Sequence, residues 1–368
     1  MPSALLAGHF GPSEAGEAAT IGAFRRALPG WTPVLASSEP AVTRAAHGCA
    51  TVDARRPAAL VRAAANADAT VLAGWSIGAG DDERPGLRTA VALVAAAKLR
   101  RHPTALLGIS ARAGGSAWQR RLSRRLVAGA DLVVLRDDLS ARHLEASGVP
   151  GPFRIGTDPA WLDVQDRRPA PADGPRPRRV VVAIESRGCP ASLVERLGTA
   201  LAGLAAEGAE IALQPWHAAA GDGQDHGLAG ELAGQIAAPV RVLPPLPDLG
   251  AGNAMAAGAG AVVALSSHAL IAAAAANVPA VAVACDPAID DLARRLDQPR
   301  VAADASAAEI AAAIGAALDH EPPLPNAVEG QIATAEEGFR LLRVLLSEGR
   351  SDEVAELSGL PLRRGSDG

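Results

Sequence analysis

A repeating order of short apolar runs and helical segments is the feature that most constrains the fold of this 368-residue chain. Each apolar run of four or five residues predicts a buried strand, and each segment with helical spacing of its apolar residues predicts a helix. In the first half the predicted strands are Ala4–Ala7, Pro33–Ala36, Thr70–Ala73, Ala105–Ile109 and Asp131–Leu135, and the predicted helices are Ala15–Leu28, Pro57–Asn66, Arg88–Leu99, Trp118–Ala128 (basic and amphipathic) and Asp138–Ser147. This alternation predicts an α/β fold with doubly wound parallel sheets.

The alternation is interrupted once, by Asp163–Arg179 (DVQDRRPAPADGPRPRR), which has almost no apolar residues. Its Pro, Arg and Asp content is typical of an interdomain linker. We therefore predict a Rossmann-like domain at residues 1–163, a linker at 164–179, a second Rossmann-like domain at 180–349 and a flexible tail at 350–368. Two open sheets joined in this way imply a central cleft, with ligands at the carboxyl ends of the strands.

Composition narrows the classes of ligand. Only 2% of the residues are aromatic, none is tyrosine, and the formal net charge is −5. General nucleic-acid binding needs a basic surface, and single-strand platforms need stacked aromatic rings, so neither is favoured. Hydrophobic residues make up 49% of the chain, which excludes a wholly disordered protein. Polar side chains, charges and backbone amides must therefore hold the ligand.

The sequence lacks the marks of secretion or membrane insertion. Residues 1–17 have no basic stretch before an apolar one, and polar residues interrupt the apolar run Leu265–Ala284, which favours a buried helix between two strands. Cys49, Cys189 and Cys285 follow no metal-ligand spacing, which indicates reduced thiols. We expect a soluble, cytoplasmic protein.

A glycine-rich segment, Gly8–Glu17 (GHFGPSEAGE), follows the first predicted strand. Its spacing fits neither the dinucleotide fingerprint nor a phosphate-binding loop of the Walker type, and Glu14 and Glu17 would repel a phosphate. The segment is either a tight turn into a helix or a loop whose amides face a ligand. If the segment is a ligand-facing loop, Gly11 and Gly16 are candidate substrate-binding residues.

Two arginines follow predicted strands. Arg136 comes after Asp131–Leu135 and either holds its loop through an ion pair beside a capping aspartate or contacts an anionic ligand. Arg187 comes after Val180–Ile184 and is either a surface residue or a bidentate contact to a phosphate or carboxylate.

A second polar segment contains Trp216, His217, Asp222, Asp225 and His226 in a glycine-rich stretch. It lacks the helical spacing or thiolates of a metal site, so no metal is predicted. A loop at the edge of the cleft is the favoured interpretation, with His217 as a candidate substrate-binding residue.

His268 is the leading candidate for acid–base chemistry. It opens a helix directly after the predicted strand Ala261–Leu265, where Ser266 or Ser267 can cap that helix. A histidine at the carboxyl end of a strand is well placed as a general acid or as a phosphate contact. Asp286 follows the next predicted strand, Ala280–Ala284, and is a candidate substrate-binding residue together with Ser266 and Ser267.

These segments together resemble the polysaccharide pyruvyl transferase family, especially its bacterial cell-wall branch. The family pattern A-D-L-V-x-x-R-D-x-x-S-x-x-x-L-x-x-x-G-V is similar to Ala130–Val149 (ADLVVLRDDLSARHLEASGV). The pattern M-R-L-H-A-L-I-x-A-A-x-x-G-V-P-x-V-x-I-x-Y-D-P-K is similar to this sequence over His268–Pro287. With gaps, the resemblance extends over about Gly8–Arg300.

The resemblance implies a fold similar to B-type glycosyltransferases and a transferase reaction. Such enzymes transfer the enolpyruvyl unit of phosphoenolpyruvate to two hydroxyls of a sugar, forming a cyclic ketal and releasing phosphate. By this resemblance, His268 protonates the enolpyruvyl methylene or holds phosphate, Arg187 binds the donor anion, and Arg136 organises a loop. The implied acceptor is a cell-envelope glycan or its lipid-linked precursor. Phosphoenolpyruvate is a co-substrate, and no cofactor, nucleic acid or membrane span is expected, with homo-oligomerisation left open.

The sequence departs from the family pattern where cations are expected. Ser266 replaces an arginine, Ala288 replaces a lysine, and Cys285 replaces the tyrosine before Asp286. Each lost cation removes a charge-assisted contact to the donor. Two alternatives therefore remain: a nucleotide-sugar glycosyltransferase on the same scaffold, with Asp286 as its ribose-binding carboxylate, and a non-catalytic family member.

Overall fold

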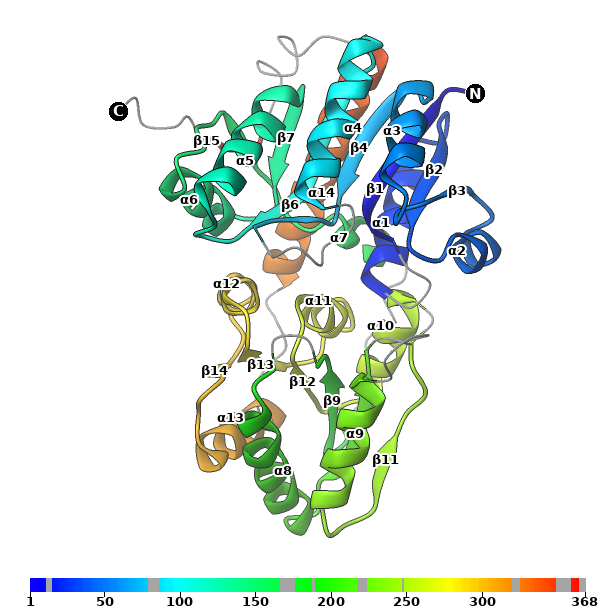
Figure 1. The fold of residues 1–368 in the computed structure, drawn as a ribbon. Helices are drawn as coiled ribbons and strands as arrows, with labels where there is room; N and C mark the ends of the chain where they lie inside the picture. The colour runs from blue at the N-terminus through cyan, green and yellow to red at the C-terminus, as the bar shows by residue number, and fades with distance from the viewer. Residues whose placement is uncertain are drawn as a thin grey trace. The chain divides into compact units, whose positions relative to one another are not determined.

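The computed structural model describes residues 1–10, 15–78, 86–165, 176–186, 189–216, 224–246, 248–319, 325–348 and 359–363. The chain divides into two compact units, each built on its own sheet (Figure 1). The first unit comprises Met1–Pro12, Glu17–Asp163 and Gln331–Gly368. The second comprises Ser13–Gly16 and Val164–Gly330.

The first unit alternates strands and helices along the chain. Its strands are β1 (Ser3–Phe10), β2 (Thr32–Ser37), β3 (Ala50–Asp53), β4 (Ala69–Ala73), β5 (Ser76–Ile77), β6 (Thr104–Ala111), β7 (Leu132–Leu135), β8 (Phe153–Ile155) and β15 (Leu362–Arg363). Its helices are α1 (Ala15–Ala27, from Glu17 onward), α2 (Pro40–His47), α3 (Pro57–Asn66), α4 (Leu87–Leu99), α5 (Ala117–Gly129), α6 (Asp138–Ala146), α7 (Ala160–Val164, up to Asp163) and α14 (Pro325–Glu348, from Gln331 onward). The strand order is β15-β8-β7-β6-β4-β1-β2-β3, with β5 beside β6, and every pair is parallel except β15 with β8.

Alternate residues of the central strands face opposite layers of helices. Leu106 of β6 and Val133 of β7 belong to an apolar core shared with α3, α4, α5 and α6. Leu107 and Val134, the next residue of each strand, face Gly338 of α14 instead. Helices therefore cover both faces of this sheet, as the predicted parallel α/β architecture requires.

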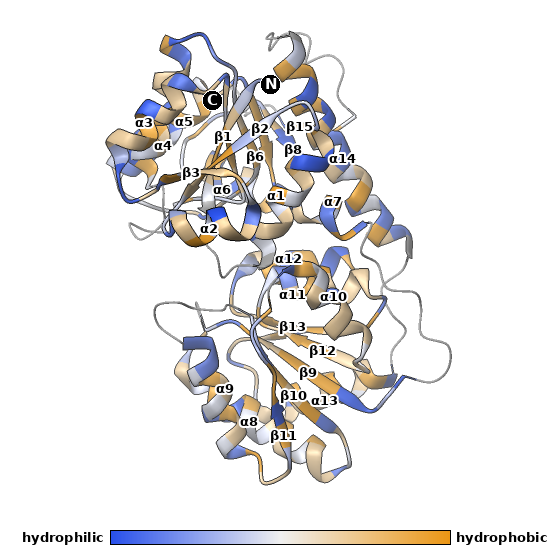
Figure 2. Cartoon of the chain, turned by 90° about the vertical axis from the view of Figure 1, so that its right-hand side faces the viewer, coloured by the Kyte–Doolittle hydropathy of each residue, from blue (hydrophilic) through white to orange (hydrophobic). Residues whose placement is uncertain are grey.

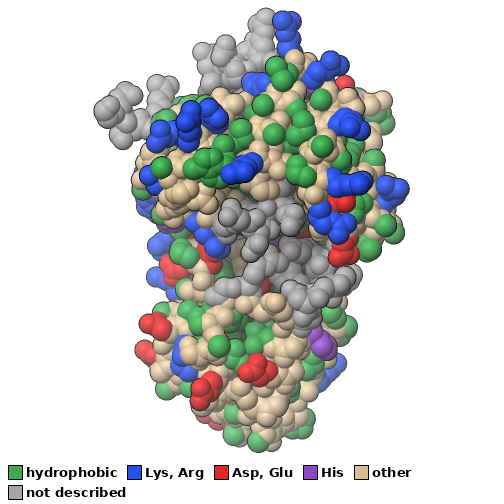
Figure 3. Space-filling model, in the orientation of Figure 1, with side chains coloured by type: hydrophobic (Ala, Val, Ile, Leu, Met, Phe, Trp, Pro, Cys, Tyr) green, Lys and Arg blue, Asp and Glu red, His purple; other side chains and the backbone are tan. Residues whose placement is uncertain are grey.

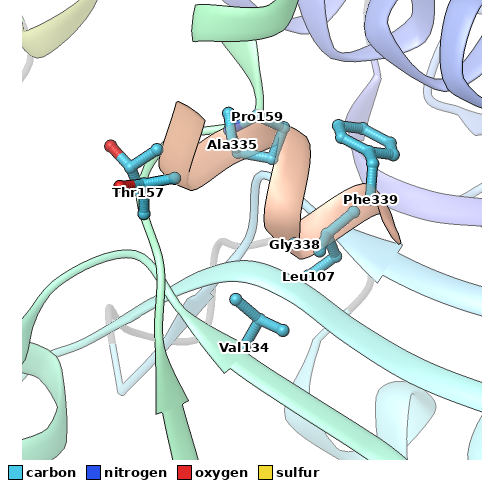
Figure 4. Close-up of a pocket in the computed structure, with 8 residues that line it drawn as sticks. Leu107, Val134, Thr157, Pro159, Ala335, Gly338 and Phe339 are labelled. Atoms are coloured by element: carbon cyan, nitrogen blue, oxygen red, sulfur yellow. The ribbon is translucent and has the colours of Figure 1, made fainter. Parts of the chain in front are cut away.

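Helix α14 returns the chain to the first unit. A small pocket lies where it meets β6 and β7, and its volume of about 10 Å³ leaves room for about one water molecule (Figure 4). The hydroxyl of Thr157 donates a hydrogen bond of 2.6 Å to the side chain of Gln331, the first residue of α14 that belongs to the first unit. The sequence predicts residues 331–349 in the second domain, because only Asp163–Arg179 has the composition of a linker, whereas the contacts of Gln331 and the residues after it place them in the first unit.

Part of the predicted tail is ordered in the first unit. Leu362 and Arg363 form β15, which pairs antiparallel with Arg154 and Phe153 of β8. Arg363 also forms ion pairs with Asp138 and, at 3.0 Å, with Glu145 of α6.

The second unit is a six-stranded parallel sheet in the order β11-β10-β9-β12-β13-β14. Its strands are β9 (Arg179–Ile184), β10 (Glu210–Pro215), β11 (Val240–Val242), β12 (Ala261–Ala264), β13 (Ala280–Ala284) and β14 (Arg300–Ala302). Its helices are α8 (Ala191–Ala206), α9 (Gln224–Gln235), α10 (Leu249–Ala257), α11 (Ser267–Ala275), α12 (Pro287–Arg295) and α13 (Ala307–Asp319). The central strands are strongly hydrophobic, which is typical of a sheet buried on both faces (Figure 2).

Candidate functional site

The strand order of the second unit places the loops after β9 and β12 next to each other at one edge of the sheet. After β9 the chain adds β10 and β11 on one side of it, and then returns to place β12 on the other. The loops that follow β9 and β12 therefore begin side by side at the carboxyl edge of the sheet and run in opposite directions from there. Such a place is called a switch point, and open α/β sheets bind their ligands at it. Ala183 of β9 pairs with Ala264 of β12, so both loops begin at the same level.

His268 lies at this switch point, near the start of α11. Ser266 is the N-cap: its side chain is buried, and its hydroxyl accepts a 3.2 Å hydrogen bond from the N–H of Ala269. His268 is the second residue of the helix and is half-buried. The free N–H groups of a first helical turn favour an anion, so the imidazole stands beside a potential phosphate site.

Gly16 packs against the His268 ring, and both residues belong to the second unit. A Cβ atom at position 16 would lie 2.2 Å from Cε1 and 2.3 Å from Nε2 of His268. Because real Cβ atoms do not approach other heavy atoms so closely, any larger residue would displace the imidazole. Two sequence-predicted candidates, distant along the chain, are thus in direct contact.

Asp225 fixes the loop that follows β9. Its Oδ1 atom accepts hydrogen bonds from the N–H of Ser186 at 2.8 Å and from the Ser186 hydroxyl at 2.6 Å. Asp225 is buried in the first turn of α9, so the carboxylate serves as an anchor for this loop. Arg187, the next residue after Ser186, lies outside the described residues.

The loops after β9 and β13 meet through two cysteines. The Sγ atoms of Cys189 and Cys285 are 4.0 Å apart. Their hydrogen bond lowers the pKa of Cys285 and raises the pKa of Cys189, because the first thiolate formed accepts the remaining S–H. Asp286, the next residue, caps α12 by accepting a 2.8 Å hydrogen bond from the N–H of Ala288.

Arg136 belongs to the first unit, where two carboxylates hold it. Its guanidinium lies 3.7 Å from Oδ2 of Asp137 and 3.6 Å from Oδ2 of Asp158. Asp137 is also the N-cap of α6, accepting a 2.6 Å hydrogen bond from the N–H of Ser140. The structure therefore contains the ion pair and the cap, and contact between Arg136 and a ligand stays a prediction.

The remaining candidates cannot be placed. Gly11, His217 and Asp222 lie outside the described residues, as Arg187 does. Across the described part of the chain, no three His, Cys, Asp or Glu side chains gather closely enough to hold a metal ion.

The sequence matches the family model described as "Polysaccharide pyruvyl transferase" over residues 18–287, well over half of its length. The chain belongs to the polysaccharide pyruvyl transferase family. The matched region includes Arg136, Ser266, His268 and Asp286. A search of curated protein sequences gives no match.

Solved structures confirm the fold class. A putative UDP-N-acetylglucosamine 2-epimerase from Listeria monocytogenes superposes with a TM-score of 0.62 at 12% identity, covering 98% of each chain. UDP-GlcNAc 2-epimerase from Neisseria meningitidis, bound to UDP-GlcNAc, gives 0.61 at 11% identity and covers 94% of this chain and 100% of its own. A glycosyltransferase from Rickettsia africae gives 0.58 at 12% identity, covering 97% and 99%. The fold is therefore similar to that of B-type glycosyltransferases, as predicted.

One further prediction concerned membrane insertion. Among the helices that the structure describes, none combines the length and the apolar composition needed to span a bilayer.

Sequence reasoning missed the contacts that organise the site. Nothing in the spacing of Cys189 and Cys285, or of Ser186 and Asp225, indicates that each pair meets. Their proximity depends on the strand order, in which β9 lies between β10 and β12 and β13 lies beside β12, and a predicted list of strands does not contain that order.

Proposed function

We propose that this protein transfers the enolpyruvyl unit of phosphoenolpyruvate to a sugar of a cell-envelope glycan or its precursor. Family membership supports this donor and acceptor class. The single observation that carries the proposal is the position of His268, which stands at the switch point beside the N-terminus of α11 and against Gly16. An acid–base group next to an anion-binding helix terminus is what the reaction needs.

In the proposed reaction, protonated His268 gives a proton to the methylene carbon of the donor. The neighbouring carbon becomes electrophilic, and a first sugar hydroxyl adds to it. Phosphate then leaves with the electrons of the broken C–O bond, and a second hydroxyl of the same sugar closes the ketal. One hydroxyl proton restores His268 and the other leaves with phosphate. The N-terminus of α11 and Arg187 would stabilise the phosphate.

A nucleotide-sugar reaction is the second candidate. Several solved structures of similar fold contain bound UDP or a UDP-sugar. Asp286 would be the ribose-binding carboxylate, at the carboxyl end of β13. One of its oxygens already accepts the N–H of Ala288, so a ribose would compete with the capping of α12 for this carboxylate.

Release of phosphate from phosphoenolpyruvate tests the proposal. The purified protein, incubated with sugars and lipid-linked sugars, should release phosphate only when an acceptor is present. His268→Ala should lower this rate by about 10²- to 10⁴-fold, the usual contribution of a general acid. Gly16→Ala should lower it too, because its methyl group would displace the imidazole.

Two control variants match these substitutions. His226 is exposed in the first turn of α9, and a Cβ at Gly30 would meet nothing within 4 Å. His226→Ala and Gly30→Ala should therefore keep the full rate. No phosphate release with any acceptor would reject pyruvyl transfer. Thermal stabilisation by UDP, and not by phosphoenolpyruvate, would then support the nucleotide-sugar candidate.

A further inference from the structure

The charge of the chain is distributed very unevenly. The segment Gly86–Ala130 contains nine Lys and Arg residues and no Asp or Glu, although the whole chain has a formal net charge of −5. This segment forms α4, β6 and α5, which all belong to the first unit. Lys and Arg side chains are spread over the visible face of that unit (Figure 3).

Helix α5 concentrates this charge on one side. Trp118, Arg121 and Arg125 follow one another at helical spacings of three and four residues, and Arg124 lies beside them. All four residues are exposed. At 1.5 Å of rise per residue, the exposed row from Trp118 to Arg125 is about 10 Å long, and its cations, from Arg121 to Arg125, occupy about 6 Å of it.

The opposite side of α5 fixes this orientation. Leu126 and Val127 are buried in the apolar core beneath α4 and α5, so the helix cannot turn its arginines inward. Within the described residues, neither Arg121 nor Arg125 forms an ion pair with a carboxylate. The nearest acidic helix along the chain, α6, has its Asp138 carboxylate paired with Arg142 and Arg363.

Trp118 adds an amphipathic ring to the row of charges. Its side chain is 42% exposed, whereas Trp75, Trp161 and Trp216 are buried. The guanidinium of Arg88 on α4 lies 4.3 Å from the ring centroid and holds the indole in place. Tryptophan is enriched at the interface between lipid headgroups and water.

We propose that the outer face of α5, formed by Trp118, Arg121, Arg124 and Arg125, docks this protein reversibly on an anionic lipid bilayer. The exposed Arg121 and Arg125 lie one helical turn apart on the outer side of α5, and a row of cations along a helix suits a plane of phosphate headgroups better than a single small anion. A bilayer touches one face of the protein only, so the acidic residues elsewhere in the chain need not approach it. This inference does not depend on the reaction proposed above.

Co-sedimentation of the full-length protein with vesicles tests the proposal. The protein should bind phosphatidylcholine vesicles containing about 30% phosphatidylglycerol, should not bind phosphatidylcholine alone, and should be released at about 0.5 M salt. The double variant Arg121→Gln/Arg125→Gln should lower partitioning by about 30-fold. Trp118→Ala should weaken binding while leaving its salt dependence unchanged.

The matched control is Arg241→Gln/Arg343→Gln, which removes the same charge from exposed positions on β11 and α14. This control should keep its vesicle binding. Equal loss in both double variants would overturn the proposal, because net charge and not this face would then decide binding. Binding to neutral vesicles, or to no vesicles, would also overturn it. Binding to heparin or duplex DNA without vesicle binding would assign the face to an acidic polymer instead.

Discussion

Ser266 occupies the position at which the family pattern has an arginine, and its structural role limits how that loss is compensated. Its buried hydroxyl caps α11, a role that an arginine side chain does not fill. The replacement therefore removes a cation from the switch point and adds a fixed helix terminus beside His268. Any positive charge that binds a donor there has to come from that terminus or from an arginine in another loop.

Cys189 and Cys285 form the second residue-scale feature of this site. Each is partly buried and lies near carboxylates, Glu185 being common to both. Burial and negative neighbours disfavour a thiolate, and only the hydrogen bond between the two sulfurs favours it. The lowered pKa of Cys285 thus depends on the Cys189 thiol.

Alkylation as a function of pH tests this dependence. The rate at Cys285 follows its thiolate fraction, which rises as the pH passes the pKa of the thiol. Cys189→Ala removes the hydrogen bond, so the pKa of Cys285 should rise and its rate curve should move to higher pH. At about pH 8 its alkylation should be several-fold slower, as peptide mass spectrometry can measure.

Cys49 provides an internal control for this experiment. It is buried in the first unit, where a side-chain nitrogen of Arg25 lies 2.7 Å from its sulfur. Its alkylation curve should be the same in both proteins. An unchanged curve for Cys285 would show that the two sulfurs do not share a hydrogen bond in solution.

Elements with strong apolar patterns could be predicted from the sequence, and short edge elements could not. The central strands β9, β12 and β13 are apolar runs apart from Arg179 at the start of β9, and the structure places them within one residue of the predicted ends. Strands β3 and β14 were missed because they lie at sheet edges and are mostly exposed or half-buried, so their sequences lack the apolar run that marks a strand.

The same limit applies to the candidate site. Because polar residues that directly follow apolar runs stand at carboxyl ends of strands, the sequence could identify His268, Ser266 and Asp286 as neighbours of one sheet edge. It could not show that Gly16 contacts His268, since that contact joins segments that are far apart in the sequence.

Helix α14 carries an element-scale prediction at Gly338. This glycine faces the small pocket formed with Leu107 and Val134 (Figure 4). A Cβ atom there would lie 3.5 Å from Leu107 and 3.8 Å from Val134, which is ordinary van der Waals contact. Gly338→Ala should therefore raise the free energy of unfolding by about 1–2 kcal/mol, through helix propensity and the buried methyl group.

Gly330→Ala is the control within the same helix. A Cβ at position 330 would meet nothing within 4 Å, so this variant gains helix propensity alone, about 1 kcal/mol. Urea unfolding of both variants separates propensity from packing. A Gly338→Ala protein less stable than the parent would show that the pocket cannot admit a methyl group.

At the scale of the whole molecule, the first unit is completed by the last segment of the chain. Beyond Gly330, the buried large side chains of α14 are Ile332, Phe339, Leu341, Leu342 and Leu345. Burial of each contributes about 1.5–3 kcal/mol, so together they approach the entire stability of a typical domain. The N-terminal sheet is thus expected to depend on residues encoded at the other end of the gene.

A chain ending at Gly330 tests this dependence, and a chain ending at Arg363 is its control because it keeps every described residue. In the shorter chain, amides of β6 and β7 should lose their protection from hydrogen exchange, because the sheet face that α14 covers would be exposed to water. Amides of β9 and β12 should stay protected, since their core is formed within the second unit by α8, α9 and α13. Mass spectrometry of peptic peptides resolves the two regions. Protection of β6 and β7 that survives the truncation would show that the first unit is stable without α14.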